Sequence, residues 1–217
     1  SRSPATPADR AFLAAGFGAP PYGHGVLGTT TSLEALTLDD VRGFHAAAWR
    51  PEAATLIVAG DLDHGAVTEA AAEPLGSWTR RPRGVDAVGP IGSVGPSEPS
   101  RVVRLVDRPG APQSELRIGH TAPSRRTPAY HALVTLNGIL GGEFSSRINR
   151  NLREAKGLTY GARTAFDLRR AGGSFVCQTS VQTDGTAAAI AEILRECDAI
   201  RLDGAVGADE LARAKAS

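Results

Sequence analysis

An arginine and a tyrosine that stand seven residues apart, Arg153 and Tyr160, could act together on a carbonyl group. Arg153 falls in the last turn of a helix expected from Ser145 to Lys156, where a cation suits the carbonyl end of the helix dipole. Tyr160 follows Gly157, a residue typical of helix ends, and lies on an expected strand. A phenol can donate a hydrogen bond to a developing oxyanion while a guanidinium holds the substrate carbonyl. This spacing could therefore bring both groups to the same edge.

A structural role for these two residues is the one that composition alone favours. Arg153 could pair with a carboxylate such as Glu154 or Asp167, while Tyr160 could pack across a sheet. The chemistry of the residue types does not decide between the two alternatives.

Two adjacent glycines, Gly141 and Gly142, precede the expected helix. Free backbone N–H groups at this point could cradle an anion, although two glycines alone more often mark a tight turn. Ser145 and Ser146 are interpreted as helix caps, because a nucleophilic serine would need a positioned base and the sequence contains no GxSxG elbow.

Histidines and cysteines do not form a recognisable metal or redox motif. The five histidines, none in HxxxH, HxxEH or HExxH spacing, are His24, His45, His64, His120 and His131. We therefore expect no metal ligands in this chain. Cys177 and Cys197 lack CxxC spacing and are expected to be free thiols, with a single bridge between them as the alternative.

Length and charge exclude several classes of protein. The 217 residues allow one large domain or two small ones. Lys plus Arg number 24 against 23 Asp plus Glu, so net charge gives no argument for binding nucleic acid or an anionic membrane. No apolar run approaches the roughly 18 residues of a membrane span and no secretory signal is present, so we expect a soluble chain.

Hydrophobic spacing and turn residues predict the order of helices and strands. The expected helices span 7–15, 38–49, 63–73, 145–156 and 185–201, with others starting at 128 and 208. The expected strands span 54–59, 101–106, 113–120, 158–168 and 174–181, the last two as a hairpin. Capping boxes are expected at Thr31 with Glu34 and at Thr37 with Asp40. The absence of regular helix–strand alternation predicts an α+β fold with a largely antiparallel sheet.

Two stretches of the sequence carry a family resemblance. The run LGGEFSSRINRNLREAKGLTYG, 140–161, resembles the signature of the second domain in insulinase/pitrilysin-type zinc peptidases, the inverzincins that include mitochondrial processing peptidase. Upstream, YGHGVLG at 22–28, SLEALT at 32–37, the Phe44-His45 and Arg50-Pro51 pairs and LIVAGD at 56–61 are similar to the closing half of that family's first domain. The two matches occur in the family's order and together cover nearly the whole chain.

The resemblance implies a fragment built from two half-domains of a duplicated fold. Residues 1–78 would be the second half of the first peptidase-like domain, 79–100 a linker, and 101–217 the first half of the second, non-zinc domain. The family binds zinc through HxxEH and a more distant Glu in the part of the first domain that this chain lacks, so zinc is expected in the parent protein or in a partner.

The resemblance also assigns roles to the candidate residues. Tyr160 would help to stabilise the tetrahedral intermediate and Arg153 would orient the substrate backbone, while Gly141 and Gly142 would correspond to a glycine-rich loop that handles substrate. The chain would belong to a zinc metalloendopeptidase that cleaves small or unfolded peptides, and it should be inactive alone because nothing in it can activate water.

The alternative is a non-catalytic scaffold or partner subunit of the same fold, like the core proteins of respiratory complexes. The expected partners are a peptide substrate and either the missing half-domains or a zinc-bearing subunit. The protein could also form a homodimer or a heterodimer. We expect neither nucleic-acid binding nor a membrane span. Bacterial relatives of the family occur in the cytoplasm and in the periplasm, so the resemblance leaves the compartment open.

Overall fold

The computed structural model describes residues 5–18, 21–78 and 101–216. The chain divides into two compact units, one made of Ser1–Val26 with Gly92–Ser217 and the other of Leu27–Ile91. The N-terminal segment therefore groups with the C-terminal part of the chain. The predicted linker, 79–100, lies outside the described residues, and the division into 1–78 and 101–217 stays a prediction.

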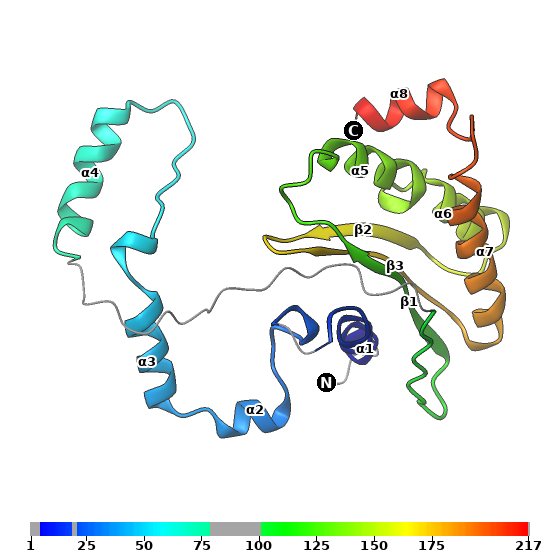
Figure 1. Ribbon diagram of the computed structural model, residues 1–217, viewed down its shortest axis with the longest axis horizontal. Coiled ribbons are helices and arrows are strands. Elements are labelled where there is room, and N and C mark those ends of the chain that lie inside the picture. The colour runs from blue at the N-terminus through cyan, green and yellow to red at the C-terminus, as the bar shows by residue number, and fades with distance from the viewer. Residues whose placement is uncertain (1–4, 19–20, 79–100, 217) are drawn as a thin grey trace. The chain divides into compact units, whose positions relative to one another are not determined.

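The larger unit is an antiparallel sheet with helices on both faces (Figure 1). Its strands are β1 (Gln113–Ala122), β2 (Ala162–Leu168) and β3 (Gly173–Gln182). Its α-helices are α1 (Ala5–Phe17), α5 (Tyr130–Asn137), α6 (Arg147–Asn149), α7 (Thr186–Ala199) and α8 (Ala208–Ala216). The short 3₁₀ or π segments are η1 (Pro21–Gly23), η3 (Gly138–Gly142), η4 (Arg150–Ala155) and η5 (Thr183–Gly185). This arrangement confirms the predicted α+β class.

The sheet has the order β1-β3-β2, so the predicted hairpin of β2 and β3 contributes the central strand and one edge. Cys177 on β3 is paired with Ile118 on β1 and with Thr164 on β2. Successive residues of a strand point to opposite faces, so these three side chains share the face that carries the core. The buried apolar cluster on this face comprises Leu140, Ile148, Leu152, Ala162, Phe175, Cys177, Val181, Ala189 and Ile193.

The predicted helix over 145–156 forms as α6 followed directly by η4, a π-type segment. Ile148 and Leu152 are four residues apart, share one face and are fully buried. The helix ends where Gly157 adopts a φ of +60° and the Leu158 N–H donates to the Leu152 carbonyl at 2.8 Å. Glycine suits this left-handed position because it has no Cβ.

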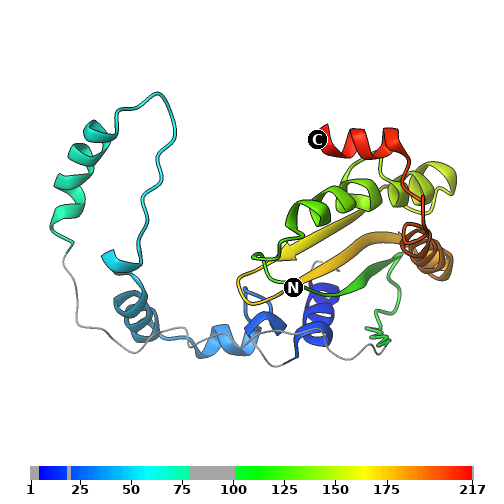
Figure 2. The same cartoon turned by 45° about the horizontal axis from the view of Figure 1, so that its top comes forward.

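The opposite face of the sheet is covered in part by α1, as the views in Figures 1 and 2 both show. Arg117 of β1, whose side chain is only 8% exposed, donates through Nε to Asp9 of α1 at 2.6 Å. Phe17 and Tyr22 stack edge to face with ring centroids 5.7 Å apart. Tyr22, which follows α1 in the short segment η1, is therefore buried.

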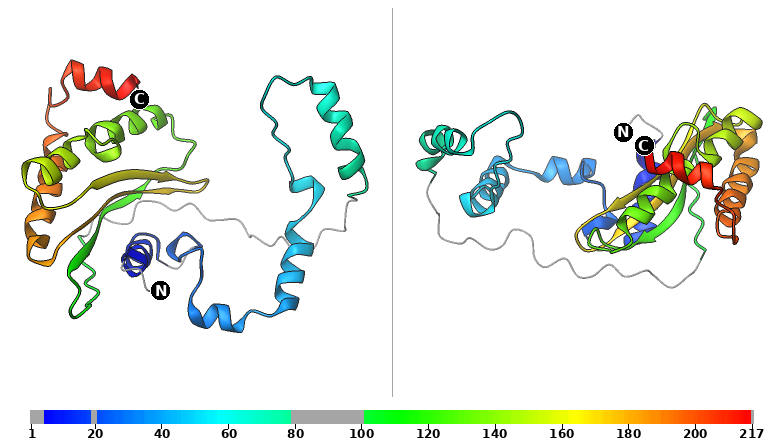
Figure 3. Two further views of the ribbon diagram at one scale, coloured as in Figure 1. Left: turned by 180° about the vertical axis from the view of Figure 1, so that it is seen from behind. Right: turned by 90° about the horizontal axis from the view of Figure 1, so that it is seen from above.

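The smaller unit contains α2 (Thr30–Ala35), α3 (Leu38–Ala48), the 3₁₀ segment η2 (Pro51–Ala53) and α4 (His64–Gly76), visible as separate helices in Figure 3. The predicted capping box of Thr37 and Asp40 is present at the start of α3. The other predicted box is wrong, since Thr29 and Ser32 cap α2 in place of Thr31 and Glu34. The hydroxyl of Thr29, two residues before the predicted cap Thr31, accepts a hydrogen bond from the Ser32 N–H in the first turn of α2.

Two predicted strands, 54–59 and 101–106, do not form among the described residues. Their apolar side chains are open to solvent, with Ile57 85% and Leu105 91% exposed. A strand needs a neighbour to accept and donate its backbone hydrogen bonds, and the described chain offers neither segment a partner. None of the described helices is long and apolar enough to cross a membrane.

Candidate functional site

Tyr160 lies on the turn between η4 and β2, two residues before the strand begins. Its side chain is 94% exposed, and its hydroxyl has no hydrogen-bond partner among the described residues. The alternative in which Tyr160 packs across the sheet is therefore wrong. The turn presents the phenol to solvent with both of its hydrogen-bonding functions free.

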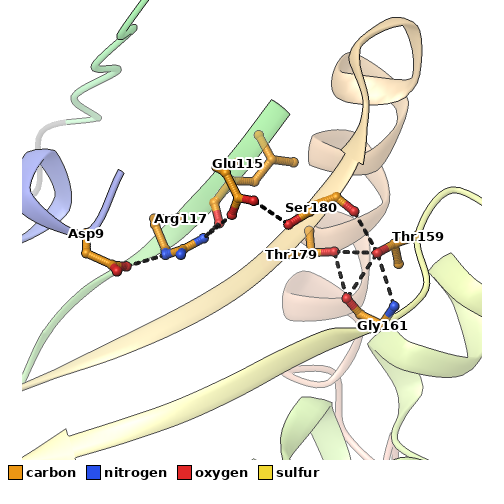
Figure 4. A network of polar contacts seen from close by, with 8 residues as sticks. Asp9, Glu115, Arg117, Thr159, Gly161, Thr179 and Ser180 are labelled. Atoms are coloured by element: carbon orange, nitrogen blue, oxygen red, sulfur yellow. Dashed lines mark hydrogen bonds and ion pairs between the residues drawn. The ribbon is translucent and has the colours of Figure 1, made fainter. Parts of the chain in front are cut away.

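The backbone on either side of Tyr160 is held by the hydroxyl of Thr159 (Figure 4). Thr159 Oγ1 donates to the Ser180 carbonyl at 2.8 Å and accepts from the Gly161 N–H at 3.1 Å. Thr179 Oγ1 lies 2.9 Å from both Thr159 Oγ1 and the Gly161 carbonyl. These contacts fix the residues before and after Tyr160 to the central strand, so an exposed side chain stands on an anchored backbone.

The same polar network continues to the far edge of the sheet (Figure 4). Ser180 Oγ donates to Glu115 at 2.6 Å, and Arg117 donates to the other oxygen of Glu115 at 3.3 Å. Arg117 in turn reaches Asp9 of α1. Both side chains of the Glu115–Arg117 pair are largely shielded from solvent, which limits screening of their attraction. The Tyr160 turn is thus connected through β3 and β1 to the N-terminal helix.

Arg153 occupies the last turn of η4, as predicted, and its guanidinium carbon lies 4.1 Å from the ring centroid of Phe144. A cation over an aromatic face is attracted by the ring quadrupole. Asp167, one predicted partner, pairs instead with Arg169 at 2.6 Å. Across 5–18, 21–78 and 101–216, no carboxylate lies within ion-pair distance of Arg153, so its N–H donors are not committed to an acid.

Tyr160 lines a depression that Arg153 does not line. Tyr160 borders a shallow open depression formed with the segments Ala111–Gln113 and Gln182–Asp184. Arg153 sits beside Phe144 at the preceding helix end. A substrate that touched both residues would have to extend over the surface from the helix end to the turn.

Gly141 and Gly142 are required by packing inside the larger unit. A Cβ on Gly141 would lie 2.6 Å from the Thr164 side chain, and one on Gly142 would collide with Asn137. Thr164 and Asn137 are themselves hydrogen bonded at 2.9 Å. Gly141 therefore allows η3 to approach β2, and Gly142 allows close contact with Asn137 at the end of α5. The role of both glycines in substrate handling stays a prediction.

The polar residues of α6 and η4 anchor this helical run to its neighbours. Asn149 donates to the Phe144 carbonyl at 2.6 Å and accepts from the Ala162 N–H at 3.1 Å. Asn151 donates to Glu192 and Glu196 of α7 at 2.8 and 2.7 Å. Together with Arg195 and Lys156, the Asn151 amide lowers the pKa of Glu192 to about 2.

Ser146 stands at the start of α6, but its hydroxyl makes no capping hydrogen bond and is buried without a partner among the described residues. Thr159 was missed by the sequence reasoning. The signal available for it was a threonine flanking an expected turn, because threonine hydroxyls often bond to backbone groups two residues away.

The thiols are poorly suited to chemistry. Cys177 is buried and free, and this burial raises its pKa to about 12. Cys197 is also free and lies on α7, where partial burial raises its pKa. A thiol that stays protonated at neutral pH is a weak nucleophile and a weak metal ligand.

Comparison with known families places these features in context. The profile of one family, described as the peptidase M16 inactive domain, matches residues 35–217. The chain belongs to this M16 family. The resemblance to insulinase/pitrilysin-type peptidases is thereby confirmed, and the described region that carries Arg153 and Tyr160 falls within the match.

Individual relatives of the M16 chain agree with this result. An uncharacterized zinc protease of Mycobacterium leprae is 35% identical over 157 residues, which cover 72% of this chain and 35% of that protein. The crystal structure of a peptidase M16 inactive domain from Pseudomonas fluorescens matches with a TM-score of 0.87 at 24% identity, covering 99% of this chain and 50% of that one. A chain of complex III from Candida albicans matches with a TM-score of 0.73 at 18% identity, covering 97% of this chain and 50% of that one. The M16 chain therefore spans only a third to a half of the length of these relatives.

The described residues of the M16 chain do not fit a zinc site. Within them, no three His, Cys, Asp or Glu side chains are grouped so that they could hold a metal ion. The histidines on β1 and α5 make other contacts: His120 lies 5.5 Å from the Phe175 ring and His131 lies 5.2 Å from Tyr130. The zinc named in the M. leprae relative would need ligands from outside these residues.

Proposed function

We propose that this M16 chain supplies the substrate-binding side of a zinc metalloendopeptidase that cleaves short or unfolded peptides. The observation that carries the proposal is the state of Tyr160, a fully exposed phenol on a turn whose flanking residues are hydrogen bonded to the central strand. A catalytic hydrogen-bond donor has to be free in the resting protein and yet held in place. Tyr160 meets both conditions.

In this proposal Tyr160 donates its O–H to the oxygen of the scissile carbonyl as negative charge develops there. Arg153 donates to a backbone carbonyl of the extended peptide, since its guanidinium is oriented by Phe144 and not neutralised by a carboxylate of the described chain. Zinc would be held by residues of the parent protein or of a partner subunit, and would supply the Lewis acid and the activated water. The chain by itself should not hydrolyse peptides.

The test is Tyr160→Phe in the zinc-bearing protein or complex that contains this chain. Losing one oxyanion donor typically lowers kcat by about 10²-fold, with little change in KM. Tyr130→Phe is a matched control, because it removes the same atom from a tyrosine of α5 whose ring is covered by Arg125. Equal kcat values for wild type and Tyr160→Phe would return Tyr160 to a structural role.

A second candidate function is that of a non-catalytic scaffold subunit. It is favoured by the description of the matched family as an inactive domain and by the shared fold with a chain of complex III. The two candidates differ in what Tyr160 does for peptide binding. A scaffold would tolerate Tyr160→Ala without any loss of affinity for an unfolded peptide.

A further inference from the structure

Four arginines gather at the end of the sheet where β2 turns into β3. Arg125 and Arg126 belong to the loop between β1 and α5, while Arg169 and Arg170 stand in the hairpin turn. The Arg125 N–H donates to the Arg169 carbonyl at 2.8 Å, so the two loops are bonded to each other. They meet at the left end of the sheet in Figures 1 and 2. We call these four residues the arginine patch.

Aromatic rings and a tyrosine hydroxyl hold the patch in place. The guanidinium carbon of Arg125 lies 3.3 Å from the Tyr130 ring centroid, and that of Arg169 lies 5.0 Å from the Tyr22 ring centroid. The Ala171 N–H in the hairpin turn also donates to the Tyr22 hydroxyl, at 3.4 Å. Stacking on a ring uses the face of a guanidinium, so its N–H donors stay available for an acceptor. Part of the patch is therefore oriented before any ligand binds.

The patch carries more positive charge than its own chain neutralises. The segments 122–130 and 167–173 contain the four arginines and one acid, Asp167, which leaves an excess of three positive charges. Asp167 pairs with Arg169, whereas the other three arginines are exposed and pair with no carboxylate of the described chain. Guanidinium groups stay protonated in proteins, so this excess does not depend on pH.

Asp167 shows which chemistry the patch accepts. One of its carboxylate oxygens receives hydrogen bonds from Arg169 Nε at 2.8 Å and from Arg169 Nη2 at 2.6 Å. Charge-assisted bonds of this kind are the strong ones between side chains. The net charge of the chain is only +1, so there is no general attraction for nucleic acid, and the positive charge is a local feature of these loops.

We propose that the arginine patch is a docking surface for an acidic segment of a partner protein, a run of Asp and Glu residues whose carboxylates pair with Arg125, Arg126 and Arg170. Tyr160 stands before one end of β2 and the patch follows the other end. The seven residues of β2, at about 3.3 Å each, separate these ends by roughly 23 Å. The acidic segment thus binds away from the Tyr160 turn, and the inference does not depend on the function proposed for Tyr160.

The strength of the interaction follows from the exposure of the arginines. An exposed ion pair changes an equilibrium by up to about fivefold, so the loss of two pairs should weaken binding by roughly tenfold. Salt screens such pairs, and the affinity should fall as the ionic strength rises.

The experiment uses the whole chain and a short, fluorescently labelled peptide rich in glutamate, with a second peptide in which glutamine replaces every glutamate. Anisotropy titrations give the ratio of the two dissociation constants, which removes any binding that both peptides share. The wild-type chain should prefer the glutamate peptide. The double variant Arg126→Gln with Arg170→Gln should bind this peptide roughly tenfold more weakly. Lysine at both positions should cost less, because it keeps the charge and loses only the planar donor geometry.

The matched control is the double variant Arg104→Gln with Arg108→Gln, which removes two exposed arginines from the segment before β1. It should leave the preference for glutamate intact, and urea denaturation should give the same midpoint for all variants. Equal binding of the two peptides by the wild-type chain would overturn the proposal. So would an unchanged affinity in the Arg126 and Arg170 glutamine variant, or an equal loss in the control. Tighter binding of a single-stranded oligonucleotide with the same number of charges would overturn it in favour of a nucleic-acid ligand.

Discussion

Replacement of Thr159 by valine tests whether the polar network fixes the Tyr160 turn. Valine keeps the β-branched shape of threonine and removes only the hydroxyl. In the native structure this hydroxyl donates to the Ser180 carbonyl and accepts from the Gly161 N–H. Thr159→Val therefore leaves two backbone groups without their partner, while Thr179 can still donate to the Gly161 carbonyl.

The expected loss is about 2 kcal/mol, because each of the two lost hydrogen bonds is worth about 1 kcal/mol. Amide exchange at Gly161 reports this loss locally. If opening of the turn becomes easier by about 2 kcal/mol, the Gly161 N–H should exchange about 30-fold faster, since 1.4 kcal/mol corresponds to a factor of ten. Amides in the middle of α7, remote from Thr159, should change much less.

The assay is hydrogen exchange followed by NMR, with urea denaturation of the same variants. Thr135→Val is the matched control, because the Thr135 hydroxyl donates only to the His131 carbonyl of its own exposed helix turn, at 2.9 Å. Its effect should stay within about 0.5 kcal/mol, as for most surface substitutions. An unchanged Gly161 exchange rate in Thr159→Val would refute the view that Thr159 holds the turn.

Three further outcomes are expected. Gly141→Ala should destabilise the chain by about 1–3 kcal/mol in urea denaturation, because the new Cβ would lie 2.6 Å from the Thr164 side chain. The same substitution should cost less in a Thr164→Ala background. An equal cost in both backgrounds would contradict the predicted clash between residue 141 and Thr164. The native pKa of Glu192 is lowered to about 2, below its unfolded value near 4.5, so its contribution to stability is complete above about pH 5 and is lost as the pH falls toward 2. Glu192→Gln should flatten stability against pH in this window, and an unaltered curve would count against the assigned contacts. Cys177, with a pKa raised to about 12, should resist alkylation at pH 8 in the folded chain and react more slowly than Cys197. Mass spectrometry of the labelled peptides measures both rates. Faster labelling of Cys177 than of Cys197 would contradict this prediction.

Features set by neighbouring residues were predictable from the sequence. The capping box of Thr37 and Asp40 and the helix end at Gly157 both form as expected. Each depends on contacts within a few residues, so local chemistry is sufficient. The hairpin of β2 and β3 was predictable for the same reason, since a short turn joins its strands.

Features set by distant residues were not predictable. The segments 54–59 and 101–106 have the apolar composition of strands, but strand formation depends on a partner that the described chain does not provide. Likewise, Asp9 and Arg117 are separated by 108 positions, and no local pattern indicates that they meet. The π-type turns of η3 and η4 depend on how closely η3 packs against β2 and η4 against α7, which also lies outside local propensity.

Tyr160 is one residue whose exposure is not explained by the stability of the fold. The chain is poor in aromatic residues, at 5% of its composition, yet it leaves this ring 94% exposed while its core is made largely of aliphatic side chains. Hydrophobic burial would favour the ring facing inward, and a polar residue would serve an exposed turn as well. The hydrogen bonds around Thr159 instead fix the neighbouring backbone so that the phenol stays outside. Departures of this kind concentrate at functional sites, because a binding group must remain accessible even when the fold gains nothing from exposing it. That reasoning supports a role in binding for Tyr160 independently of the family to which the chain belongs.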